Sequence, residues 1–206
     1  MPTPENAPEW FRALLETELS LWITLSATQI ERLYKHYELL LAWNKRINLT
    51  SIQPGSEMIL RHYCESLFLG AHIPARSDDL TIADIGSGPG LPGVPLAILQ
   101  PGWRLTLIES NQRKAVFLRE ATRDLSNVSV LAKRAKDVST NFDWIVSRAV
   151  DPMEVLVNIP RLAPRVGLLL GQADISGLKT QSIVAWAEPI RLPWGDRRFC
   201  VYGEVP

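Results

Sequence analysis

Cysteine is scarce in this chain. Only Cys64 and Cys200 occur among 206 residues, and neither has the short spacing to another cysteine or a histidine that metal sites use. We therefore expect no metal centre and a reducing compartment. No apolar stretch approaches the ~18 residues that cross a bilayer, and the first residues lack a basic segment followed by an apolar core. The sequence predicts a cytoplasmic protein without a membrane span.

An excess of positive charge is also missing, because 22 Lys and Arg residues balance 22 Asp and Glu residues. Such a chain has no global field for nucleic acid, so any RNA contact must come from a local patch. The length and the 46% apolar share fit one α/β unit with an additional segment. We divide the chain into an N-terminal helical segment, 1–79, and a second part, 80–206, forming one compact monomer.

The N-terminal segment has helical periodicity. Ser26 and Gln29 form a capping box that opens the second helix, and a third helix is predicted over about residues 56–69. Aromatic and aliphatic side chains recur at helical spacing before and after this box, and we favour a core role for them over a base-stacking surface. Residues 74–79 are the expected linker.

Strands and helices alternate in the second part. The strand candidates are residues 80–85, 104–109, 128–131, 144–147 and 167–170. Helical stretches such as 112–125 and 152–162 separate them. This is the doubly wound α/β pattern, a mostly parallel twisted sheet flanked by helices, whose ligand crevice lies beyond the carboxyl ends of the strands. Residues 189–192 and 199–202 are the candidates for a final antiparallel pair.

A glycine-rich loop follows the first strand. Gly86, Gly88 and Gly90 stand at alternate positions, which lets bare main chain approach a ligand. Glu109 ends the next strand, at the spacing of about twenty residues at which an acid takes ribose hydroxyls. A cap for the helix that starts near Asn111 is the structural alternative for Glu109. Together these features predict a site for a nucleoside-like cofactor.

Three residues around the loop favour S-adenosyl-L-methionine over a dinucleotide. A dinucleotide needs a helix N-terminus directed at its pyrophosphate, whereas Pro89 and Pro92 stiffen the turn and remove donors. Asp84 would repel a diphosphate, but it could order the loop or face the ammonium of S-adenosylmethionine. An NAD-dependent oxidoreductase stays open as a less favoured alternative.

Further motifs have no obvious packing explanation. They are the segments WNKRINLT at 43–50, RHYCESL at 61–67, KRAK at 133–136 and DWIVSRA at 143–149. Together with the glycine loop and residues 107–110, they resemble the RsmG (GidB) family, bacterial methyltransferases that modify N7 of a guanine in 16S ribosomal RNA. The likeness extends from about residue 25 to residue 170.

The resemblance implies a class I (Rossmann-like) methyltransferase sheet with an N-terminal helical cap, and 16S ribosomal RNA or the small ribosomal subunit as partner. By position, Ala135 and Lys136 border the adenine, and Arg148 lies at the cofactor or target edge and is the catalytic candidate. The candidate cofactor-binding set, from the residues and the resemblance together, is Asp84, Gly86, Gly88, Leu91, Glu109, Ala135, Lys136 and Arg148.

The chain departs from the family pattern at several positions. Lys136 stands where the family usually has glutamate, and Glu65 replaces an aspartate. A lysine is absent after the fifth strand, near Leu170, and the C-terminal end has Glu204 instead of basic residues. These departures keep open another alternative, a non-catalytic cofactor-binding module that docks on ribosomal particles.

The candidate RNA contacts are Lys45, Arg46, Asn48 and His62. Capping of the helix end is the alternative for the polar residues at 44–48. His62 and Glu65 could instead be a hydrogen-bonded pair that positions the helical segment, and Arg148 could form a salt bridge with Asp143 or Asp151. We expect Lys114 in solvent.

Overall fold

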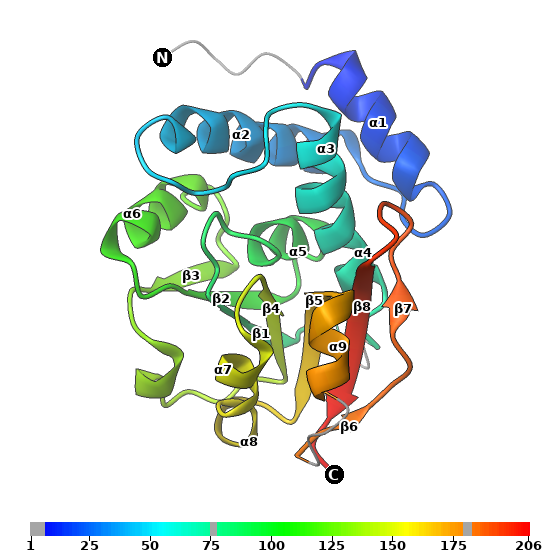
Figure 1. Cartoon of the computed structure of the whole chain (residues 1–206). Helices are drawn as coiled ribbons and strands as arrows, with labels where there is room; N and C mark the ends of the chain where they lie inside the picture. The colour runs from blue at the N-terminus through cyan, green and yellow to red at the C-terminus, as the bar shows by residue number, and fades with distance from the viewer. Residues whose placement is uncertain (1–6, 75–77, 179–182) are drawn as a thin grey trace.

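A computed structural model describes residues 7–74, 78–178 and 183–206, and Figure 1 shows its arrangement. The strands are β1 Thr81–Ile85, β2 Arg104–Ile108, β3 Val128–Leu131, β4 Trp144–Arg148, β5 Arg165–Gly171, β6 Ala185–Trp186, β7 Ile190–Arg191 and β8 Arg198–Glu204. The helices are α1 Glu9–Leu19, α2 Ala27–Asn44, α3 Ser56–Met58, α4 Glu65–Ala71, α5 Gly93–Leu99, α6 Gln112–Ala121, α7 Pro152–Leu156, α8 Ile159–Leu162 and α9 Gln172–Leu178. A π-helical turn, Ile59–Cys64, joins α3 to α4, and a 3₁₀ turn, Ala135–Asp137, follows β3.

The described strands form one sheet in the order β3-β2-β1-β4-β5-β8-β6, with β7 also paired to β8. Strands β1 to β5 are parallel, and β8 runs antiparallel to β5. Strands β2 and β3 lie on one side of β1, and β4 and β5 lie on its other side. The point at which the strand order reverses, the topological switch point, therefore lies between β1 and β4. Ligands of such sheets bind at this point, beyond the carboxyl ends of the strands. The predicted fold class is confirmed.

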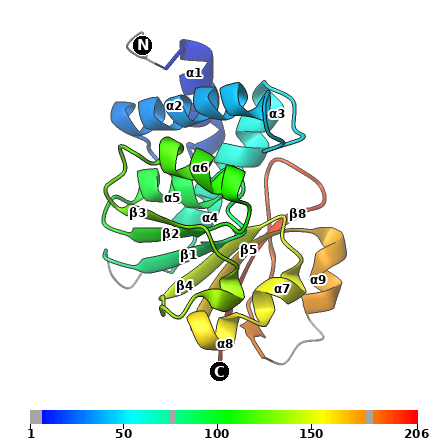
Figure 2. The ribbon, with the colours of Figure 1, turned by 90° about the vertical axis from the view of Figure 1, so that its left-hand side faces the viewer.

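Helices cover both faces of the sheet. Figure 2 shows α5 and α6 over one face, with α1 and α2 stacked above them, and α7, α8 and α9 over the other face. No helix in the described part of the chain combines the length and the apolar character that a membrane crossing needs.

The predicted elements differ from the structure in three places. The expected helix over 152–162 is two helices, because Pro160 lies in the first turn of α8 and has no N–H to continue the helix from α7. The third helix contains the π-helical turn, which periodicity alone does not indicate. The predicted final pair is β7 with β8, whereas β6 was not predicted. The expected linker, 74–79, lies partly outside the described residues.

The helical cap shares one apolar core with the sheet. Phe11 of α1 and Tyr63 of the π-helical turn are fully buried in the same cluster as Leu107 of β2. The rings of Phe11, Tyr34 and Tyr37 contact one another and pack in or against the core, as predicted, whereas Trp10 of the same predicted stripe is 50% exposed. The division between 1–79 and 80–206 stays a prediction.

The predicted capping box also fastens the cap to the sheet domain. Gln29 accepts from Ser26 N through Oε1 at 2.8 Å, while its Nε2 donates to the carbonyls of Ile98 and Leu99 at the end of α5. One side chain therefore satisfies donors or acceptors at the ends of two helices.

Gly93, the first residue of α5, lies where no side chain fits. A Cβ there would lie 2.3 Å from Leu107 Cδ2 and 2.7 Å from Asp84 Oδ2. We predict that Gly93→Ala lowers the free energy of unfolding by about 1–3 kcal/mol, the usual cost of overpacking a core. Urea unfolding would measure it.

Gly177→Ala on α9 is the matched control, because a Cβ there meets no atom of the described residues within 4 Å. In a helix this replacement is expected to leave stability unchanged or raise it by about 0.5–1 kcal/mol. Equal destabilisation by both substitutions would contradict the packing argument at Gly93.

Candidate functional site

The glycine loop after β1 has the close turns that its sequence indicates. Gly86, Gly88 and Gly90 all have positive φ, at 70°, 52° and 86°. A Cβ at Gly86 would lie 2.4 Å from Val150 Cγ2. Glycine is therefore required at Gly86 both by backbone conformation and by space.

Asp84 fastens the far end of this loop. It is fully buried, and its Oδ2 accepts from Gly93 N at 3.0 Å, whereas Oδ1 has no hydrogen-bond partner among the described residues. Burial raises the pKa of Asp84 to about 7. Of the two roles considered for Asp84, its contacts match ordering of the loop, and it lines neither of the cavities described below.

Glu109 braces the loop from β2. Its Oε2 accepts from Gly88 N at 2.9 Å and its Oε1 from Asn111 N at 2.7 Å. The cap of α6 is the Asn111 side chain, which accepts from the backbone of Arg113 and Lys114. Each carboxylate oxygen has a further lone pair, so Glu109 can hold the loop and still accept from a ligand.

A first cavity, of about 640 Å³, opens beyond the carboxyl ends of β1 and β2. Its lining includes Gly86, Gly88, Ile108, Glu109, Lys114, Ala135, Lys136, Ala149, Val150 and Asn158. Bare main chain, an acid for hydroxyls and apolar walls are what an adenosine-like group requires. The residues present therefore fit the predicted cofactor.

Arg161 of α8 fixes the wall of this cavity formed by the 3₁₀ turn. It donates through Nη2 to Ala135 O at 2.8 Å and to Asn158 Oδ1 at 2.9 Å, and through Nη1 to Val138 O. Ala135 and Lys136 thus border the cavity, where the resemblance puts the adenine.

A second cavity, of about 300 Å³, adjoins the first and shares Gly86, Gly88, Lys114 and Ala149 with it. Its other lining residues include Thr50, Ser51, Ile52, His62, Leu91 and Arg148. Most of these belong to the helical cap. Leu91 and Arg148, predicted as cofactor contacts, line only this second cavity.

Arg148 ends β4, and its partners differ from those expected. Its Nη1 donates to Nδ1 of His62 at 2.7 Å, and its Nε lies 4.0 Å from Glu65 Oε2. The salt bridge suggested with Asp143 or Asp151 is wrong. Asp143 instead accepts from the backbone and hydroxyl of Thr81, and Asp151 caps α7. Burial lowers the pKa of Arg148 to about 10, so the group stays charged at neutral pH.

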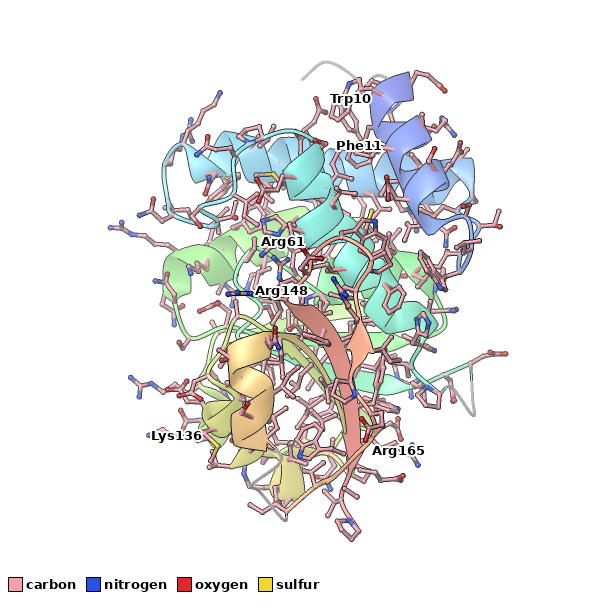
Figure 3. All side chains as sticks on the ribbon, turned by 45° about the vertical axis from the view of Figure 1, so that its right-hand side comes forward. Trp10, Phe11, Arg61, Lys136, Arg148 and Arg165 are labelled. Carbon is pink, nitrogen blue, oxygen red and sulfur yellow. The ribbon has the colours of Figure 1, made fainter. Side chains whose placement is uncertain are left out.

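Glu65 is the centre of a buried charge cluster. It accepts from Arg198 Nε at 3.1 Å and Nη2 at 2.6 Å, and Arg61 Nε lies 3.2 Å from Oε1 without hydrogen-bond geometry. Figure 3 shows the nitrogens of Arg61 and Arg148 near each other, while Lys136 lies well apart. The suggested pair of His62 with Glu65 is therefore wrong, since both instead engage Arg148.

His36 of α2 connects the cap to the glycine loop. A carbonyl can only accept, so Nε2 of His36 donates to Pro89 O at 2.9 Å, and Nδ1 accepts from the Tyr63 hydroxyl at 2.8 Å. Burial lowers the pKa of His36 to about 4, which keeps the ring neutral. Sequence reasoning missed this histidine because nothing local distinguishes it from other helical positions.

The remaining predicted contacts are spread more widely. Lys45, Arg46 and Asn48 are exposed and line neither cavity, whereas Lys114, expected in solvent, lines both. Thr50 and Arg198 were not predicted, although Thr50 closes the WNKRINLT motif. Within the ranges described, no group of three His, Cys, Asp or Glu side chains could hold a metal ion.

Comparison with known sequences gives consistent matches. The family model described as rRNA small subunit methyltransferase G matches residues 29–170. A ribosomal RNA small subunit methyltransferase G of Xanthomonas campestris pv. campestris is 39% identical over 191 residues, 86% of this chain and 88% of the relative. One of Xylella fastidiosa is 34% identical over 194 residues, 86% and 90% of the two chains.

Solved structures share the fold at low sequence identity. A SAM-dependent methyltransferase from Aquifex aeolicus has a TM-score of 0.59 at 13% identity, covering 72% of this chain and 93% of that one. Fibrillarin of Aeropyrum pernix, solved with natively bound S-adenosyl-L-methionine, has a TM-score of 0.54 at 13% identity, covering 68% and 73%.

The buried Asp84 predicts a pH dependence of stability. Its folded-state pKa, about 7, lies above its ordinary value of 3.8, so the folded protein holds the proton more tightly than the unfolded chain. Stability is therefore lost as pH rises from about 4 to about 7, by up to about 4 kcal/mol. Asp84→Asn keeps an acceptor for Gly93 N–H but cannot ionise. Relative to wild type, its unfolding free energy should rise over this pH range.

Urea unfolding at several pH values measures this difference, with the exposed Asp124→Asn as the matched control. The control should follow the wild-type curve. Parallel pH curves for wild type and Asp84→Asn would refute the assignment.

Proposed function

The chain belongs to the rRNA small subunit methyltransferase G family, and on that premise we propose that it transfers a methyl group from S-adenosylmethionine to N7 of a guanine in 16S ribosomal RNA. We further propose that it acts in the cytoplasm, where ribosomal RNA is found. We also propose that the chain acts as a monomer.

The observation that carries the proposal is the pair of adjoining cavities at the switch point of the sheet. The first fits the cofactor, and the second is bordered by the cap and by the charged Arg148. Two reactants placed in these cavities would meet above Gly86 and Gly88, which line both. Holding reactants together in this way is a large source of rate enhancement.

The proposed reaction needs no side chain that acts as a general base. When bound, S-adenosylmethionine supplies a methyl group on a positively charged sulfur. Guanine N7 has an in-plane lone pair at neutral pH, so no residue has to remove a proton. The residues of the chain therefore bind and orient: Glu109 holds ribose hydroxyls, Ala135 and Lys136 border the adenine, and Arg148 serves the target side.

An incubation with radiolabelled methyl donor tests the function. The protein is given free 16S ribosomal RNA or small ribosomal subunits that lack the modification, and the product is analysed for 7-methylguanosine. We expect label in ribosomal RNA at a single guanine. Binding of the donor without transfer would favour a non-catalytic module, and thermal stabilisation by NAD but not by S-adenosylhomocysteine would favour an oxidoreductase.

Glu109 provides the sharpest test of the cofactor site. Glu109→Ala removes the acceptor for the ribose and the brace on Gly88 N–H. Hydrogen bonds to charged groups contribute about 1.5–3 kcal/mol, so the dissociation constant for S-adenosylmethionine should rise about 10- to 100-fold. Calorimetric titration measures this constant. Glu120→Ala, on the exposed side of α6, is the matched control and should bind like wild type. Unchanged affinity in Glu109→Ala would remove this residue from the site.

A further inference from the structure

A chain of hydrogen bonds with a fixed direction runs from Arg148 through His62 to Thr50. Arginine can only donate, so Nδ1 of His62 accepts from Nη1 at 2.7 Å. Burial, with a smaller effect of nearby Arg148, lowers the pKa of His62 to about 2, so the ring is neutral and its one N–H is on Nε2. This N–H donates to Oγ1 of Thr50 at 2.8 Å.

The hydrogen-bonding capacity of the Thr50 hydroxyl is only partly used. Its oxygen accepts a second hydrogen bond, from Ile52 N at 3.1 Å. A hydroxyl has two lone pairs and one hydrogen, and both lone pairs are now used. No acceptor in the described ranges is paired with the hydrogen, and Thr50 lines the second cavity. The Thr50 hydroxyl could therefore form a further hydrogen bond with an occupant of that cavity only as the donor.

The backbone around Thr50 is held in place as well. Asn44 Oδ1 accepts from Leu49 N at 2.9 Å and from Thr50 N at 3.0 Å, and its Nδ2 donates to Thr50 O at 2.9 Å. A donor fixed before binding loses little conformational entropy when its partner arrives. The Asn44 amide thus prepares Thr50 for recognition and does not itself line the cavity.

The chemistry of the purine edge decides which group meets this donor. Transfer to N7 requires that no hydrogen bond occupy the N7 lone pair. Beside N7, guanine has the acceptor O6, whereas adenine has an amino group that donates. An arginine fork would bond both O6 and N7 of guanine and so block the reaction. A hydroxyl has a single hydrogen, which can bond O6 and leave N7 free.

We propose that the Thr50 hydroxyl donates to O6 of the target guanine and that Thr50 selects guanine over adenine in the second cavity. This proposal rests on the function proposed above. With adenine in the same position, the Thr50 hydroxyl and the amino group would be two donors facing each other without an acceptor, which is costly in a buried site.

The test compares guanine with 2-aminopurine, which lacks the O6 oxygen and the N1 hydrogen of guanine but keeps N7 and the 2-amino group. The methylated guanine is first mapped in wild-type reactions and then replaced by 2-aminopurine, or by inosine, in ligated 16S ribosomal RNA. We measure kcat/KM for wild type, Thr50→Val, Thr50→Ala and Thr50→Ser. The matched control is Thr17→Val, an exposed threonine on α1. Comparing variants by their guanine to 2-aminopurine ratio cancels the different intrinsic reactivity of the two bases.

We expect Thr50→Val to lower the ratio of kcat/KM on guanine to kcat/KM on 2-aminopurine about tenfold, which corresponds to about 1.4 kcal/mol, and inosine to behave like guanine. The ratio removes any loss common to both bases, such as the loss of the acceptor for His62 and Ile52 N. Thr50→Ser keeps the hydroxyl and should keep the wild-type ratio, as should Thr17→Val. Thr50→Ala provides a second hydroxyl-free variant should valine impair folding, which thermal unfolding reports.

Equal losses on guanine and 2-aminopurine, or a wild-type ratio in both hydroxyl-free variants, would overturn the proposal. If wild type methylates no ribosomal RNA at all, the proposed function fails, and the role of Thr50 fails with it. The two failures are distinguishable because failure of the Thr50 proposal alone is seen with an active wild-type enzyme, whereas failure of the proposed function is seen as an inactive one.

Discussion

The site depends on two buried acidic side chains that hold the glycine-rich loop. Asp84 and Glu109 accept from the backbone N–H groups of Gly93 and Gly88, at opposite ends of the turn. A loop with glycine at alternate positions has few side chains to pack, so its shape depends on hydrogen bonds: these two, the one that Pro89 O accepts from His36, and those that Ile108 O accepts from Gly86 N and Ser87 N. Because buried polar groups without partners are costly, the loop and its three supporting side chains are stable only together.

Positive charge is concentrated at one buried place near the site. The chain has no net charge, yet Glu65 is surrounded by Arg61, Arg148 and Arg198, so this cluster has a net charge of +2. The carboxylate lowers the cost of burying Arg148 next to a cavity, since an unpaired buried cation would be strongly unfavourable. Of the three arginines, Arg148 also lines the second cavity. A positive charge is therefore placed at this cavity although the whole chain is neutral.

Local sequence patterns predicted the features of the structure that depend on residues close together in the sequence. Periodicity gave the five parallel strands, and the spacing from Gly86 to Glu109 predicted the loop and its acid. The predictions of side-chain partners that were wrong concern contacts between distant segments. Arg198 is 133 residues from Glu65, and Arg148 is 86 residues from His62. A single sequence does not indicate which remote side chains meet, so Arg148 was given the wrong partners and Arg198 was missed.

The helical cap is part of the site because its side chains contact the glycine loop and line the second cavity. His36 and Tyr63 support the glycine loop, while Thr50 and His62 line the second cavity, and all four belong to the segment predicted as 1–79. The part of the chain after residue 80 supplies the first cavity and one side of the second. The cap supplies the other side, with Thr50 and His62. Arg148 of β4 fixes the direction of the hydrogen bonds that run from it to these two residues, since an arginine side chain can only donate. The donor that the second cavity offers therefore depends on both segments, because the hydroxyl lies in the cap and the arginine that orients its partner lies in the sheet.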